Sequence, residues 1–143
     1  MKAVGALNGG FQAVTIHRSA SALNAATLMA VHQISALPII DDDRLMGIVT
    51  ERDILARVVA CGLDPATTPV ADIMSTDLVV ADISEGCAAC LQKMQQAHIR
   101  HLILLDRTQG NRFAGIVSLR DLLAEDVAEK ADEVRLLNAY VAV

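Results

Sequence analysis

An internal duplication constrains the fold of this chain more than any other feature of the sequence. The segment GIVTERDIL (47–55) returns as GIVSLRDLL (115–123), so an apolar run is twice followed by a hydroxyl residue and, three positions later, an aspartate. A shift of 65 positions aligns the earlier parts of the two copies, and a shift of 68 aligns these junctions. The difference falls in the polar stretch 106–115, where a hairpin loop tolerates an insertion. The chain is therefore predicted to contain two copies of one small unit.

Each copy has the pattern of a β-α-β-β-α unit. In the first copy we expect a strand at 13–16, a helix capped by Ser19 or Ser21, a hairpin at 37–40 and 45–49, and a helix at 50–60. In the second copy we expect a strand at 78–81, a hairpin at 102–105 and 113–117, and a helix from Ser118. The predicted fold class is α+β, with short, mainly three-stranded sheets that carry helices on one face.

The two copies are expected to pack against each other, because a unit this small cannot bury both faces of its sheet alone. Such packing predicts pseudo-two-fold symmetry, a shared core, and two clefts where the sheets meet. We place the first repeat at 11–64, a linker containing Pro65 and Pro69 at 65–75, and the second repeat at 76–125.

A helix is predicted to close the chain at 126–143. Val127, Ala131, Val134 and Asn138 fall on one face of it, with charged residues elsewhere. This face either covers the core of its own chain or contacts another copy, and the pattern is compatible with both interpretations.

Composition excludes several classes of function. The formal net charge of −5 disfavours nucleic-acid binding, and an aromatic content of 2% disfavours base stacking. No apolar run approaches the ~18 residues that span a bilayer, so no membrane association is expected. The odd number of cysteines, 3, indicates free thiols in a reducing compartment, which predicts a cytoplasmic protein.

Cys87 and Cys90 form a C-x-x-C pair, which is typical of redox or zinc sites. The sequence contains no second pair to complete four zinc ligands, and the two cysteines align with Ala22 and Ala25 on a core-facing stripe. We therefore expect them to be buried, with no metal. No phosphate-binding loop, nucleophile elbow or reactive pair is visible, so no enzymatic activity is predicted.

The two junctions, together with VADIMSTD (70–77) and HIRHLILLD (98–106), resemble a tandem pair of CBS domains of the stand-alone bacterial kind. The resemblance covers about 11–125, most of the chain. It implies a disc-like module, commonly a homodimer of pairs, that acts as a regulatory sensor. It also implies adenine-containing ligands such as AMP, ATP, NAD(H) or S-adenosylmethionine in the clefts, with AMP or ATP favoured and no required cofactor.

Thr50 and Asp53 have two interpretations. A carboxylate can accept hydrogen bonds from both hydroxyls of a ribose, with the threonine hydroxyl in support. The same spacing at a helix start forms a capping box without any ligand. The resemblance favours ribose binding for Thr50 and Asp53 in one cleft and for Ser118 and Asp121 in the other.

Arg100 and His101 precede an apolar strand, where a guanidinium suits phosphate oxygens. The resemblance places both residues opposite Thr50 and Asp53, and it adds Arg120 as a phosphate ligand in that cleft. The other cleft would face the uncharged Ser35 and Ala36, with Arg52 as its cation. We therefore expect the Thr50 cleft to bind a phosphate-bearing ligand more tightly.

The adenine is expected to lie against backbone edges and aliphatic walls rather than aromatic rings. Alignment of the repeats suggests four wall residues: Ile16, Ile39, Ala81 and Leu104. The predicted function is a regulatory module in which nucleotide binding alters contact with an unknown protein. The alternative is a dimeric interaction scaffold whose clefts no longer bind ligand.

Overall fold

The computed structural model describes residues 2–7 and 14–141. The first repeat contains α1 (Ala22–His32), β1 (Ala36–Asp41), β2 (Arg44–Thr50) and α2 (Glu51–Asp53), which continues as a π-helix at Ile54–Val59. The second contains β3 (Val80–Asp82), α3 (Cys87–Ala97), β4 (His101–Asp106), β5 (Arg112–Ser118) and α4 (Leu119–Val141). Short 3-10 helices lie at Val4–Ala6, Val70–Asp72 and Arg107–Gln109. The order confirms two α+β repeats.

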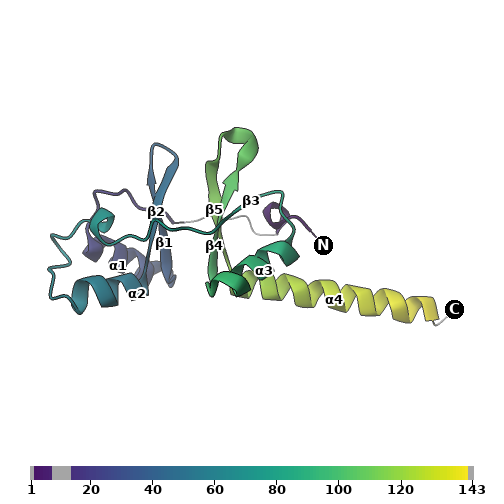
Figure 1. The fold of residues 1–143 in the computed structure, drawn as a ribbon. Coiled ribbons are helices and arrows are strands. Elements are labelled where there is room, and N and C mark those ends of the chain that lie inside the picture. The colour runs from purple at the N-terminus through teal and green to yellow at the C-terminus, as the bar shows by residue number, and fades with distance from the viewer. Residues whose placement is uncertain (1, 8–13, 142–143) are drawn as a thin grey trace.

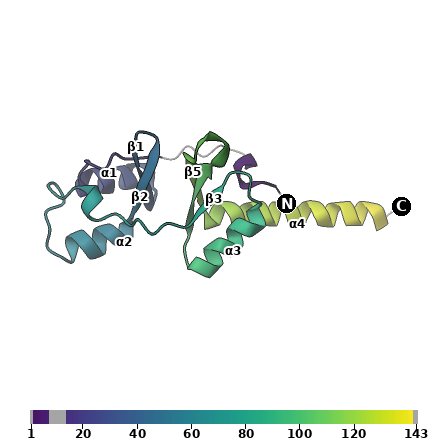
Figure 2. The same ribbon diagram turned by 45° about the horizontal axis from the view of Figure 1, so that its top comes forward.

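The two small sheets lie side by side at the centre of the molecule, with the helices on their outer faces (Figure 1, Figure 2). The second sheet has the predicted three strands, with β3 parallel to β4 and β4 antiparallel to β5. The first sheet contains only the antiparallel pair β1 and β2. The strand predicted at 13–16 contributes one parallel bridge, from Ile16 to Ile39, and Ala13 lies outside the described residues.

Details of the backbone repeat between the two units. The helices α1 and α3 each end at a non-glycine residue in the left-handed conformation, Gln33 and His98, both with φ of 54°. Each hairpin has a register irregularity at the equivalent place, between Ile39 and Ile40 and between Leu104 and Leu105. Since these features follow the 65-residue shift, the duplication extends to local geometry.

Each repeat has its own hydrophobic core, and the expectation of one shared core is wrong. The first cluster includes Leu37, Ile39 and Val49 against α1, and the second includes Leu102 and Leu104 against α3. The alternation of strand side chains explains this result, because each sheet turns one apolar face to its own helices. Only the opposite faces are left to meet at the junction between the repeats.

The helix predicted from Ser118 and the predicted C-terminal helix are one continuous helix, α4, which extends away from the two sheets (Figure 1). Leu122, the fourth residue of this helix, is buried in the second core. Val127 and Val134 are 67% and 55% exposed, so the interpretation in which this face covers its own core is wrong. The apolar side chains beyond the second turn of α4 therefore face solvent in the single chain.

Candidate functional site

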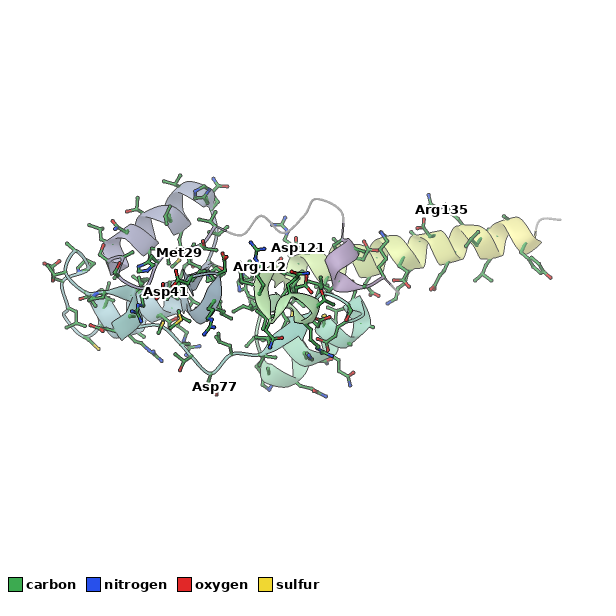
Figure 3. All side chains as sticks on the ribbon, turned by 90° about the horizontal axis from the view of Figure 1, so that it is seen from above. Met29, Asp41, Asp77, Arg112, Asp121 and Arg135 are labelled. Atoms are coloured by element: carbon green, nitrogen blue, oxygen red, sulfur yellow. The ribbon has the colours of Figure 1, made fainter. Side chains whose placement is uncertain are left out.

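Two pockets lie between the repeats, where the predicted clefts were expected. The first has a volume of about 630 Å³, and its wall includes Thr50, Arg52, Asp77, Arg100 and His101. The second has a volume of about 350 Å³, and its wall includes Ser35, His101, Ser118, Arg120 and Asp121. Seen from above, Asp77 lies on the connection between the repeats and Asp121 at the start of α4 (Figure 3). Both volumes fall within the range of small-molecule sites.

The Thr50–Asp53 pair forms a complete capping box at the start of α2. The Thr50 amide and hydroxyl both donate to Asp53 Oδ2, at 2.9 and 3.1 Å, and the Asp53 amide donates to Thr50 Oγ1 at 3.2 Å. Arg57 Nε lies 3.8 Å from Asp53 Oδ1. Asp53 is 8% exposed and is absent from the pocket wall, whereas Thr50 lies on that wall. The structure thus gives Asp53 a capping role and leaves Thr50 facing the pocket.

The equivalent Ser118–Asp121 pair is also a capping box, but a more open one. The Ser118 amide donates to Asp121 Oδ2 at 3.2 Å, and the Asp121 amide donates to Ser118 Oγ at 3.1 Å. Asp121 is exposed and lies on the wall of the second pocket. The two aspartates therefore share a local role and differ in their access to a ligand.

The cations are distributed differently from the expectation. Arg100 and His101 lie in the first pocket with Thr50, as predicted, but Arg52 joins them there. Arg120, which was expected in the first pocket, lies in the second beside Ser118. Each arginine lies two residues after the hydroxyl residue of its own repeat, in the first turn of the same helix. It therefore lines the same pocket as that hydroxyl residue. The two arginines thus exchange the pockets that the sequence suggested for them.

His101 belongs to both pockets. Its Nε2 lies 3.3 Å from Ser35 Oγ, and Ser35 also lies on both walls. Burial lowers the pKa of His101; the nearby carboxylate of Asp121 opposes this shift, and Arg100 reinforces it. The pair therefore forms a polar partition between the two pockets, and the imidazole is mainly neutral at neutral pH.

The four aliphatic residues expected to hold the adenine do not line either pocket. Ile16, Ile39, Ala81 and Leu104 all belong to the hydrophobic cores. The pocket walls instead take apolar residues from the opposite faces of the strands and from neighbouring loops: Ile48, Leu78, Val79, Ile99 and Ile103 in the first pocket, and Val14, Ile34, Ala36 and Ile116 in the second. Successive side chains of a strand point to opposite faces of the sheet. A prediction that is wrong by one residue therefore selects a side chain in the core instead of one on the pocket wall.

The connection between the repeats contributes wall residues that the sequence reasoning missed. Ser75 forms a backbone bridge with Ile48 on β2, and Ser75 and Asp77 both line the first pocket. This crossing needs Gly47, because a Cβ there would lie 2.8 Å from the Ser75 carbonyl oxygen. The repeated glycine of the GIV motif was the available signal that another backbone approaches closely.

The two cysteines of the C-x-x-C pair lie in the hydrophobic core of the second repeat. Cys87 and Cys90 are buried, as expected, and burial raises the pKa of the Cys90 thiol to about 11. Among residues 2–7 and 14–141, no group of three or more His, Cys, Asp and Glu side chains could hold a metal ion. In the same part of the chain, every helix is too short or too polar to cross a bilayer.

Comparison with known proteins identifies the architecture. The model of the CBS domain family matches residues 11–60 and 70–128, once for each repeat. The CBS domain-containing protein YhcV of Bacillus subtilis is 34% identical over 127 residues, which cover 89% of this chain and 88% of that protein. The structure of a protein with CBS domains from Burkholderia ambifaria has a TM-score of 0.75 at 32% identity, covering 83% of this chain and 85% of that one.

Two further solved structures contain ligands. The CBS domain protein PAE2072 of Pyrobaculum aerophilum, complexed with AMP, has a TM-score of 0.72 at 23% identity, and the match covers 85% of this chain and 89% of that one. Hypoxic Response Protein I, with two coordinated zinc ions, has a TM-score of 0.73 at 30% identity, and the match covers 87% of this chain and 98% of that one. These ligands are properties of those two proteins.

Proposed function

Because this chain belongs to the CBS domain family, we propose that it is a regulatory module whose inter-repeat pockets bind an adenine nucleotide. The observation that carries this proposal is the composition of the first pocket, which joins Thr50 from one repeat to Arg100 and His101 from the other. A hydroxyl that faces an arginine and an imidazole suits a ligand with a sugar and a phosphate. The AMP bound by the Pyrobaculum relative supports the same ligand class.

Within this proposal, Arg52 and Arg100 hold the phosphate, and Thr50 Oγ1, whose own proton is donated to Asp53, accepts from a ribose hydroxyl. Asp53 acts indirectly, because it holds the Thr50 hydroxyl in place. Ser118, Arg120 and Asp121 perform the corresponding tasks in the second pocket. That pocket is smaller and has one arginine where the first has two, so the first pocket is the tighter site for AMP.

A homodimer is the proposed assembly. The second helices of the two repeats leave equivalent apolar side chains in solvent, Leu55 and Val59 in the first and Leu123 and Val127 in the second. Figure 1 shows α2 and the beginning of α4 on the same side of the two sheets. An exposed apolar surface of this kind is typical of an interface, and its internal symmetry suits a two-fold partner.

Isothermal titration with AMP tests the function, and the arginines provide matched variants. We expect AMP to bind, and Arg100→Gln to weaken the tighter site by about tenfold, because a charge-assisted hydrogen bond contributes about 1.5–3 kcal/mol and solvent reduces it here. Arg120→Gln should leave the tighter site within about twofold of wild type by the same reasoning. If AMP, ATP, NAD(H) and S-adenosylmethionine all fail to bind at millimolar concentration, the interaction scaffold replaces the nucleotide sensor.

A further inference from the structure

The partition between the two pockets is asymmetric although the fold is duplicated. The residues equivalent to Ser35 and Ala36 in the second repeat are Arg100 and His101. Within the described part of the chain, one hydrogen bond between side chains joins the two repeats, and it is the Ser35–His101 bond. Both of its members line both pockets. A ligand in either pocket therefore faces the same hydroxyl and the same imidazole.

The number of protons that this pair can donate depends on the charge of His101. A neutral imidazole has one N–H and a serine has one O–H, and their mutual hydrogen bond uses one of these two protons. One donor then remains for two pockets. A protonated imidazole has two N–H groups, so two donors remain, and its positive charge faces both pockets.

We propose that the Ser35–His101 pair is a shared donor that couples the two pockets, so that both bind nucleotide well when His101 is protonated and compete when it is neutral. This inference rests on the proposed nucleotide binding. Burial favours the neutral imidazole in the empty protein, and a phosphate in one pocket favours protonation. Filling the second pocket therefore draws a proton onto His101.

Other charged groups line the two pockets, and they determine the control. They are Glu51 and Arg52 on α2, Arg120 and Asp121 on α4, Asp77 on the connection, and His98 and Arg100 before β4. Of these, His98 is the one histidine. It lines the first pocket alone, so it can change the affinity of one pocket without supplying a donor to both.

The test is titration of the full chain with AMP at about pH 8.5 and about pH 5.5, on either side of the ordinary histidine pKa. The quantity measured is the dissociation constant of the weaker pocket divided by that of the tighter pocket. In wild type we expect this ratio to fall by at least about fivefold on acidification, the lower end of typical coupling between sites. AMP titrates in the same range, so the control is His101→Gln, which donates two protons at every pH and should show a constant ratio. His98→Asn, which tolerates the left-handed backbone at this position, should keep the fall of the ratio on acidification, even where the affinity of the first pocket itself changes.

A second measurement on wild type needs no variant. Titration in two buffers of different ionisation enthalpy, at about pH 7.5, should show more proton uptake on filling of the second pocket than of the first. Proton uptake by the ligand itself would contribute to both events alike. The coupling is refuted if two AMP molecules bind with a ratio that does not change with pH, if only one binds at both pH values, or if His101→Gln retains the wild-type change. It is also refuted if His98→Asn abolishes the change. If no AMP binds at either pH, the proposed function fails first, and the coupling fails with it.

Discussion

Replacement of Asp53 by alanine measures how much the first capping box stabilises the protein. The change removes Asp53 Oδ2 and leaves the Thr50 amide, a partly buried donor, without its partner. An unsatisfied donor of this kind costs about 1–3 kcal/mol. The lost negative charge at the helix N-terminus adds about 0.3–1 kcal/mol. The Arg57 pair, at 3.8 Å and half exposed on the arginine side, adds a few tenths at most.

We therefore expect Asp53→Ala to lower the free energy of unfolding by about 2 kcal/mol, measured by urea denaturation with far-UV circular dichroism. Asp121→Ala is the matched variant, because its carboxylate makes the same contact but is exposed, so that water can replace it. Its expected cost is about 1 kcal/mol or less. Asp53→Asn should also cost about 1 kcal/mol or less, since an amide oxygen can still accept from Thr50.

The comparison between the two aspartates decides whether Asp53 is mainly a structural residue. If Asp53→Ala costs no more than Asp121→Ala, the greater structural role that we infer from burial is refuted. If Asp53→Asn keeps the stability of wild type but loses AMP binding by more than about tenfold, the carboxylate charge contacts the ligand, and the capping interpretation is incomplete.

Four further outcomes follow from the geometry. Leu104→Ala, which empties a fully buried position in the second core, should cost about 2–5 kcal/mol in the same denaturation assay. In the native protein a thiol reagent should modify Cys61 alone, because Cys87 and Cys90 are buried and the pKa of Cys90 is raised to about 11. Modification of all three thiols should require denaturant, and rapid modification of two thiols in the native protein would contradict this prediction. Hydrogen bonds from the Ser84 hydroxyl and from two backbone amides lower the pKa of Asp82 to about 2. The ionised Asp82 carboxylate therefore stabilises the folded state above about pH 4, and this stabilisation is lost as the pH falls from about 4 to 2. The melting temperature of Asp82→Asn should accordingly fall less than that of wild type over this range. Leu55→Glu should convert a dimer into a monomer in light scattering, whereas Leu136→Glu, at a similarly exposed position far along α4, should not.

Much of the local structure could be predicted because it depends on nearby residues. The spacing of Thr50 and Asp53 predicted a helix start, and the capping box is present. Ser21, one of two predicted caps, accepts a hydrogen bond from the Asn24 amide at 3.0 Å. Both hairpins lie where the apolar runs and their polar turns placed them. Repetition strengthened the predictions of the junctions and the hairpins, since these signals occurred twice.

The orientation of the strands was harder to predict, because both faces of β1 and β4 are apolar. Alternation could not show that Ile39 and Leu104 face the helices while Ile103 faces the junction between the repeats. A strand with one polar face would have revealed its orientation, whereas a doubly apolar strand does not. The choice depends on the helices that pack against each sheet, and these are distant in sequence.

The sequence by itself determined the duplication, the two strand-to-helix junctions and the residue types available for a nucleotide site. Only the tertiary structure decided which of those residues meet. In the structure Arg52 lies in the first pocket and Arg120 in the second, and Asp53 is not part of the pocket wall. His101 forms a hydrogen bond with Ser35 between the two pockets. The physical reason is that spacing along the chain specifies a helix turn or a strand face, whereas a pocket between two repeats depends on their relative placement.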